Sequence, residues 1–341
     1  MNMDSLTRIV SDINSILWGP WCLIPILVGT GIFFTFSLRF VQIRQFGRAL
    51  KHVFGGLSFN GEKAGNHGMT SFQSLATAIA AQVGTGNLAG VATAMAMGGP
   101  GAIFWMWIAA FFGMATIFSE AVLAQLYRSK DEQGRIIGGP AYYISYGLGS
   151  RSMAAIFSVL CIIALGFIGN MVQANSISTA FASSFDIPTP VTGLFIILLA
   201  GFIFIGGIKR IASFAEKMVP IMALVYVLGA IYIVILYIDQ LIPTITNIFV
   251  GAFDPSAATG GIIGASVKEA IRYGVARGLF SNEAGMGSTP HAHAIARVKH
   301  PAEQGLASIV GLFIDTFVVL TATALVIMVT GVLDGQTTGI V

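Results

Sequence analysis

Two glycine-rich stretches interrupt apolar segments of this sequence, and both carry side chains that could bind a small polar ligand. The first reads Gly84-Thr85-Gly86-Asn87 and lies within an apolar run from about residue 70 to 97. Glycine allows backbone angles that break a helix, and inside a membrane such a break must be covered by protein or line a cavity. Its free amides and carbonyls could bind a ligand. Small residues that let two helices pack closely produce the same pattern, so this stretch alone leaves both interpretations open.

The second stretch, residues 277–294, contains Gly285, Gly287 and Pro290, which cannot sustain a regular helix. Transporters with inverted repeats place two broken helices at corresponding positions, with the substrate between them near the middle of the membrane. Free amides at the start of a half-helix suit a carboxylate, and unwound carbonyls suit a cation such as Na+. Because both breaks carry polar residues, the pair favours a ligand site over close packing. The polar residues of the second break are Ser281, Asn282, Glu283, Ser288 and Thr289.

The composition is that of a polytopic membrane protein. Of the 341 residues, 55% are hydrophobic and only 10% are charged, and the mean hydropathy is +0.82. Soluble domains have about 25% charged residues. A membrane span takes about 20 mostly apolar residues, and on this basis we expect eight spans, of which the second and seventh are broken. They are residues 16–37, 70–97, 101–127, 153–183, 190–207, 217–238, 260–296 and 303–331.

Lysine and arginine gather on one side of these expected spans. Cytoplasmic loops carry the excess of basic residues, so the basic loops are expected in the cytoplasm and the N-terminus outside. Segment 39–67 places Arg44, Arg48 and Lys51 between apolar residues at helical spacing, a pattern typical of an interfacial helix and also of a solvated linker. The basic segments are 38–69, 128–152, 208–217 and 297–299, and the loops without Lys or Arg are 98–100, 184–189 and 239–259.

Polar side chains inside the other spans are further candidates, because such residues usually face the interior of a helix bundle. Gln173 lies in the middle of the fourth span and could contact either a ligand or a neighbouring helix. Asp315 lies within the eighth span and is a candidate functional carboxylate. Glu120, near the cytoplasmic end of the third span, is either a functional carboxylate or a partner for a nearby basic loop, and we favour the structural pairing. Cys22 and Cys161 lie in separate apolar runs and predict neither a disulfide nor a metal site.

Four motifs follow one another between residues 70 and about 300. They are G-T-G-N-L-A-G-V-A-T-A at 84–94, G-G-P-G-A-I-F-W-M-W at 98–107, G-G-P-A-Y-Y-I at 138–144 and F-S-N-E-A-G-M-G-S-T-P-H-A-H-A at 280–294. In this order they resemble the alanine or glycine:cation symporter family, also called the sodium:alanine symporter family.

The resemblance implies an all-α polytopic membrane protein with a leucine-transporter-like inverted-repeat fold of five plus five spans. Residues 1–69 would hold an extra N-terminal transmembrane helix and the basic cytoplasmic segment. Residues 70–238 would form the first repeat and residues 239–341 part of the second. Eleven spans are expected for the family and about eight are found, so the chain resembles a member truncated at its C-terminal end.

The resemblance also implies roles for individual residues. Thr85 and Gly86 would bind the carboxylate of the substrate, Gln82 and Gln173 would face its amino group, and Phe280 would close over its side chain. Sodium would be the coupling ion, and the resemblance implies no covalent cofactor. The sodium ligands implied are the backbone carbonyls of Ala80 and Val83 at one site and the side chains of Asn87 and Ser281 at another.

The function expected is sodium-coupled symport of a small neutral amino acid, alanine or glycine, across the inner cell membrane by alternating access. A non-transporting fragment of such a symporter and a proton-coupled transporter are the alternatives, the latter with Glu120, Glu283 and Asp315 as candidate proton carriers. D-alanine is not distinguished from alanine.

Other functional classes fit the sequence less well. A channel needs a continuous hydrated path, whereas a pair of broken helices favours an occluded site. The spacing G-x-G-x-x-x-G, without a preceding strand, does not match a dinucleotide-binding loop. His291 and His293 are two residues apart and do not share a helix face, which argues against a metal site. The spans contain no nucleophile–base pair, so we expect neither an enzyme nor a nucleic-acid-binding protein.

Overall fold

The computed structural model describes residues 3–19, 22–55, 69–254 and 266–332. About four-fifths of these residues are helical, and the one sheet among them is a small antiparallel hairpin, β1 (Ser129–Lys130) with β2 (Ile136–Ile137). By length and composition, four of the described helices could cross a membrane, or five if one bent pair forms a single span. Shorter apolar helices accompany them. The expected total of eight spans therefore stays a prediction.

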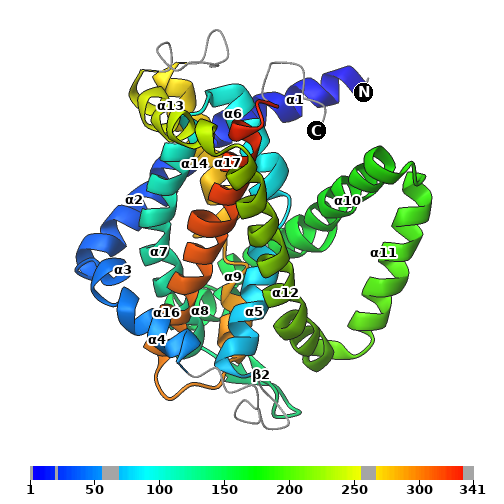
Figure 1. The fold of residues 1–341 in the computed structure, drawn as a ribbon. Helices are drawn as coiled ribbons and strands as arrows, with labels where there is room; N and C mark the ends of the chain where they lie inside the picture. Colours follow the sequence, from blue (N-terminus) through cyan, green and yellow to red (C-terminus); the bar gives the residue numbers. More distant parts are fainter. Residues whose placement is uncertain (1–2, 20–21, 56–68, 255–265, 333–341) are drawn as a thin grey trace.

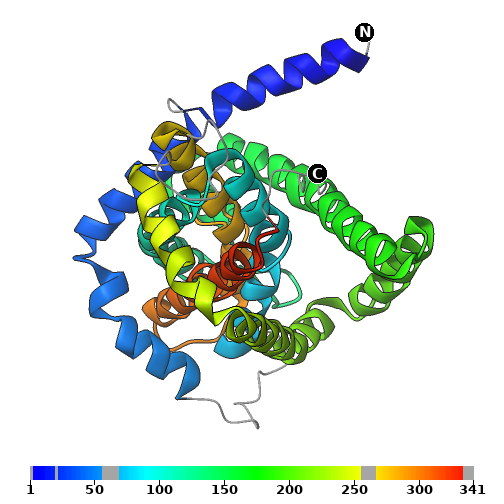
Figure 2. The same cartoon turned by 45° about the horizontal axis from the view of Figure 1, so that its top comes forward.

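The N-terminal region differs from the single span expected at 16–37. It forms two helices, α1 (Met3–Leu17) and α2 (Leu23–Ser37), and α1 projects away from the other helices (Figures 1 and 2). The sequence contains Gly19 and Pro20 between them, and proline cannot supply the amide hydrogen that a continuing helix needs. The prediction of one continuous span from residue 16 is wrong, and α2 alone packs against the long helix α7 (Ala102–Leu126).

The basic segment after α2 contains the short helices α3 (Val41–Arg44) and α4 (Phe46–Phe54). Ala49 and Val53 of α4 are buried in a cluster with Ala307 and Val310 of α16 (Pro301–Leu312). One face of the predicted interfacial helix is thus packed against protein. Its position at a membrane surface stays a prediction, and residues 56–68 of the segment lie outside the described residues.

The first glycine-rich stretch breaks its span as predicted. α5 (Ser71–Gln82) is followed by the π-helical segment η1 (Gly86–Gly90) and by α6 (Val91–Gly98), and the two halves are bent by 52°. Thr70 starts α5 with a capping box. Its hydroxyl accepts a hydrogen bond from the Gln73 amide, and the Gln73 side chain accepts one from the Thr70 amide.

α7 lies in the middle of the bundle and contacts α2, α14 (Val267–Asn282) and α16 (Figure 2). The fourth expected span is one continuous helical run made of α9 (Arg151–Cys161), the π-helical η2 (Ile162–Gly169) and α10 (Asn170–Phe185). The neighbouring helices in this part of the chain are α8 (Pro140–Gly147), α11 (Thr189–Phe204) and α12 (Gly207–Leu236). α10 and α11 lie at the edge of the bundle, and their apolar side chains are largely exposed (Figure 1).

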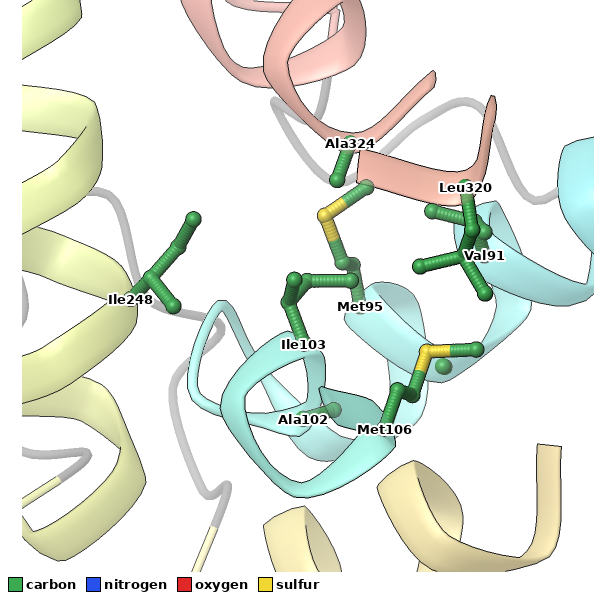
Figure 3. Packing of buried hydrophobic residues seen from close by; sticks show 9 residues of the cluster. Val91, Met95, Ala102, Ile103, Met106, Ile248, Leu320 and Ala324 are labelled. Carbon is green, nitrogen blue, oxygen red and sulfur yellow. The ribbon is translucent and has the colours of Figure 1, made fainter. Parts of the chain in front are cut away.

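A helix fills much of the region expected to be the loop 239–259. After the short η3 (Ile238–Gln240), α13 (Leu241–Phe253) packs against α7, and Ile248 joins the core cluster around Met95, Ile103 and Leu320 (Figure 3). The prediction of a loop is wrong here. Pro243 and Gly251 are typical of turns, so the sequence of this segment does not predict a helix.

The second broken segment consists of α14, an irregular stretch at 283–289 and α15 (Pro290–Ile295). Residues 260–265 of the expected seventh span lie outside the described residues. The eighth expected span is α16, the π-helical η4 (Phe313–Leu320) and α17 (Thr321–Val329).

Candidate functional site

The first break exposes backbone amides, and side chains already bind two of them. α5 ends at Gln82 because Val83 takes up extended backbone angles. The amide of Gly84 donates to Asn87 Oδ1 at 3.0 Å. The amide of Thr85 donates to Gln173 Oε1 at 3.2 Å, so α10 places its mid-span glutamine against the break. A ligand carboxylate could bind the Thr85 amide only by replacing this glutamine oxygen.

The second break depends on residues in left-handed backbone conformations. Glu283, Gly285 and Gly287 have φ values of +57°, +84° and +82°. At Gly287 a Cβ atom would also lie 2.8 Å from the ring of Phe157 and 2.9 Å from Pro140, so only glycine fits there. The side chain of Asn282 accepts the amide of Ala284 at 3.1 Å and so closes the first turn of the break.

Glu120 of α7 binds this second break directly. Its Oε2 atom accepts the amide of Gly285 at 3.0 Å, and the carboxylate is buried. The prediction that Glu120 pairs with a basic loop is wrong, since within the described ranges its contact is with backbone of the second break and no Lys, Arg or His forms an ion pair with it. Glu120 therefore positions the irregular chain between α14 and α15.

Replacing Glu120 by leucine should lower the stability of the protein. The change removes the carboxylate that accepts the amide of Gly285, and losing a hydrogen bond to such a group costs about 1–3 kcal/mol. Glu120→Gln keeps an acceptor oxygen and should lose less. Thermal unfolding in lipid nanodiscs measures both, with Glu132→Leu in the exposed hairpin loop as the control. Equal melting temperatures for Glu120→Leu and the wild type would contradict the positioning role.

The two breaks meet each other. Gln82 Nε2 donates to the carbonyl oxygen of Asn282 at 2.8 Å, and both residues are buried. At Gly86 a Cβ atom would lie 2.9 Å from Ser281 Cα, so the backbones approach as closely as glycine allows. Asn87 Nδ2 donates to Asp315 Oδ1 at 2.8 Å, which brings η4 to the same place. Residues about 200 positions apart thus form one polar cluster, as the pairing of the two breaks predicted.

Several polar atoms around this cluster are buried without a hydrogen-bond partner among the described residues. They include Gln82 Oε1, Ser281 Oγ and Asn282 Nδ2. The first faces Gly311, whose added Cβ would lie 3.5 Å away, and the last faces Gly113, whose Cβ would lie 3.7 Å away. An unpartnered buried polar group costs about 1–3 kcal/mol, which a bound polar ligand would recover. Both an acceptor and a donor are therefore available to a ligand.

The other residues implied as ligands lie around the cluster with fewer contacts to it. Phe280 precedes Ser281 on α14 but is 42% exposed, so its ring does not cover the cluster in this structure. Ala80 is an exposed residue of α5, and Val83 is partly buried. Their proposed roles in closing the substrate site and binding sodium stay predictions.

A second polar network joins α5 to the chain after the second break. Ser74 Oγ donates to the carbonyl of Ala292 at 2.8 Å, and Gln304 Nε2 of α16 donates to Ser71 Oγ at 2.7 Å. Gln304 Oε1 lies 2.8 Å from His293 Nδ1, so this histidine is held by protein. No group of three His, Cys, Asp or Glu side chains suited to a metal occurs in the described part of the chain.

Sequence reasoning missed Gln304, Gly113 and Gly311. Each lies on a helix within an apolar run, where a single glutamine or glycine carries no local signal. Their importance comes from what packs opposite them, and only the folded structure shows that.

Comparison with known protein families identifies the family of this chain. The model of the Sodium:alanine symporter family matches residues 3–341. The chain belongs to this family. It is a family of transporters, which confirms both the predicted resemblance and the prediction that the chain is not an enzyme. Together with the apolar helices, membership identifies a polytopic helical membrane protein.

Three relatives illustrate the range within the sodium:alanine symporter family. An uncharacterized transporter from Haemophilus influenzae is 46% identical over 328 residues, which are 96% of this chain and 71% of the relative. The sodium/alanine symporter AgcS of Methanococcus maripaludis is 45% identical over 95% of this chain and 70% of its own length. The probable sodium/glutamine symporter GlnT of Bacillus subtilis is 43% identical, over 95% and 66% respectively.

Proposed function

We propose that this protein is a secondary active transporter that couples Na+ to the uptake of a small neutral amino acid, alanine or glycine. The meeting of the two helix breaks carries the proposal, because it brings together Gln82 and Asn282, each of which has a buried polar atom without a hydrogen-bond partner among the described residues. Family membership and a relative named as a sodium/alanine symporter support it.

The proposed substrate site uses residues of both breaks and of α10. The carboxylate binds the amides of Thr85 and Gly86 and the Thr85 hydroxyl after Gln173 Oε1 leaves the Thr85 amide. The substrate ammonium then donates to Gln82 Oε1, an acceptor that has no partner among the described residues, and to the released Gln173. Phe280 turns inward to cover the substrate side chain.

The proposed fold is the leucine-transporter-like inverted repeat, with one repeat in residues 70–238 and part of the second in 239–341. The breaks at 83–86 and 283–289 support it, since this fold has one broken helix at the start of each repeat. We place the basic loops in the cytoplasm and the N-terminus outside the inner membrane. Sodium binds near the breaks, at the carbonyls of Ala80 and Val83 and at the cluster that contains Asn87 and Ser281.

Uptake of radiolabelled alanine and glycine into proteoliposomes tests the proposed function. An inward Na+ gradient should drive accumulation, whereas equal K+ or choline should not, and protein-free liposomes provide the background. Glutamine in excess should compete poorly. Uptake that is unchanged without Na+ contradicts sodium coupling, and uptake that follows an imposed proton gradient instead supports the proton-coupled alternative.

A further inference from the structure

The apolar residues of α1 form one stripe along the helix. Residues three, four, seven and eight positions apart lie on the same face of an α-helix. The apolar face of α1 consists of Ile9, Val10, Ile13, Ile16 and Leu17, and the polar face consists of Arg8, Ser11, Asp12, Asn14 and Ser15. A helix divided in this way normally buries its apolar face against another surface.

No described part of the chain covers this apolar face. Its side chains are all exposed, from 42% for Leu17 to 69% for Ile16. Among the described helices none packs extensively against α1, and Figures 1 and 2 both show it projecting away from the bundle. A contiguous exposed apolar surface indicates a partner, and this partner lies outside the described residues.

The direction of α1 fits the surface of a membrane. α7 is long and apolar enough to cross a membrane, so its direction approximates the membrane normal. α1 runs across this direction, at the end of the bundle where α2 begins (Figure 1). Tryptophan is enriched at membrane interfaces, and Trp18 follows α1 directly while Trp105 belongs to the first turn of α7. α1 therefore lies at the level of an interface.

A tight corner keeps α1 out of line with α2. The amide of Gly19 donates to the carbonyl of Ile16 at 3.1 Å, and an added Cβ at Gly19 would lie 2.8 Å from the carbonyl oxygen of Ser15. The next residue in the sequence is Pro20, which has no amide hydrogen to continue a helix. α2 then packs against α7. A surface-bound α1 would consequently fix the depth at which α2 and α7 enter the membrane.

We propose that α1 is an interfacial anchor whose apolar face inserts into the lipid surface beside the bundle. The partner is the bilayer itself, because amphipathic helices bury such a face at the boundary between headgroups and acyl chains. The sequence of α1 contains Asp4, Asp12 and only one basic residue, Arg8, so burial of apolar surface drives the contact and attraction to anionic lipids does not. The inference goes beyond the proposed transport, since it depends on neither the substrate nor the coupling ion.

Spin labels on single cysteines test which surface the apolar face contacts. The full chain is labelled in lipid nanodiscs, with Cys22→Ala and Cys161→Ala as the background. Collisions are measured with O2, which concentrates in lipid, and with a water-soluble nickel chelate. We expect labels on the apolar face to collide mostly with O2 and labels on the polar face mostly with nickel, whether or not phosphatidylglycerol is added to the phosphatidylcholine. The variants are Ile9→Cys, Ile13→Cys and Ile16→Cys on the apolar face and Arg8→Cys, Ser11→Cys and Ser15→Cys on the polar face.

Two results of this experiment overturn the proposal. Strong collisions with nickel at every position show that α1 lies in water. Weak collisions with both reagents on the apolar face show that protein covers it. In that case spectra broadened by a neighbouring label identify a second copy of the chain, and unbroadened spectra identify another protein segment.

Ile13→Asp tests the same contact without a label. A charge in the apolar face should release α1 from the lipid, so trypsin should cleave after Arg8 about tenfold faster than in the wild type. Ser11→Asp adds the same charge to the polar face and should leave the rate unchanged. Because Ile13 is exposed, the bundle should stay folded in both variants. Equal cleavage rates in Ile13→Asp and Ser11→Asp overturn the proposal, whereas a failure of Na+-driven uptake bears only on the proposed function.

Discussion

Gly86→Ala is expected to weaken alanine binding by about a hundredfold, because overpacking by one methyl group at a rigid contact costs up to about 3 kcal/mol. The added Cβ would lie 2.9 Å from Ser281 Cα and 3.2 Å from Ser281 Cβ. Neither atom is the free end of a flexible side chain, so one of the two breaks must move. The movement separates the amides of the first break from the polar atoms of the second.

Gly90→Ala is the matched control in the same helical segment. There the added Cβ would lie 3.7 Å from the carbonyl oxygen of Thr85, an ordinary contact, and the backbone is helical. Binding of radiolabelled alanine to both variants in saturating Na+ measures the difference, with gel filtration to show that each is folded. Affinities of Gly86→Ala and Gly90→Ala within threefold of each other would show that the two breaks need not approach this closely.

The sequence contained enough information to predict the meeting of the two breaks. Glycines with polar neighbours inside apolar runs are a local signal, and two such breaks in corresponding spans indicate a shared site. The bend of 52° after Gln82 and the left-handed residues Gly285 and Gly287 confirm that both stretches leave the helix. The individual ligand roles stay predictions, because they depend on where a substrate lies.

The features that the sequence did not predict were missed for one physical reason, which is that contacts between distant residues determine them. α13 contains a proline and a glycine that are local turn signals, yet tertiary packing decides its structure. Gly101 approaches the backbone of Gly251 so closely that an added Cβ would lie 2.1 Å from its carbonyl carbon. This contact joins two glycines that are about 150 positions apart, and the sequence around each of them does not predict it. The same holds for Gly311, which faces Gln82 across the bundle.

Hydrogen bonds connect the proposed ion and substrate sites through few residues. One path runs from Asp315 through Asn87 to the amide of Gly84, and the other runs from Gln82 to the carbonyl of Asn282. The first path joins η4 to the first break, and the second joins the two breaks. The first path ends at Gly84 in the first break and the second ends at the last residue of α14, so changes in these contacts alter the groups proposed to bind the substrate.

Gln82→Leu should break the second path and leave the first one intact. Leucine has nearly the volume of glutamine but cannot donate to the Asn282 carbonyl, so a buried acceptor loses its partner at a cost of about 1–3 kcal/mol. It also removes Oε1, the acceptor proposed for the substrate ammonium. We therefore expect alanine affinity at saturating Na+ to fall by about thirty- to a hundredfold.

The response to Na+ alone distinguishes this effect from general unfolding. Gln82→Leu leaves the proposed sodium ligands Asn87 and Ser281 unchanged, so binding of Na+ should still raise its melting temperature as in the wild type. Gln133→Leu, in the exposed hairpin loop, is the control for replacing a glutamine by leucine. Weak alanine binding together with a retained Na+ response would assign Gln82 to the substrate side of the cluster. Wild-type alanine affinity in Gln82→Leu would instead remove Gln82 from the substrate site and show that the two breaks meet without its hydrogen bond.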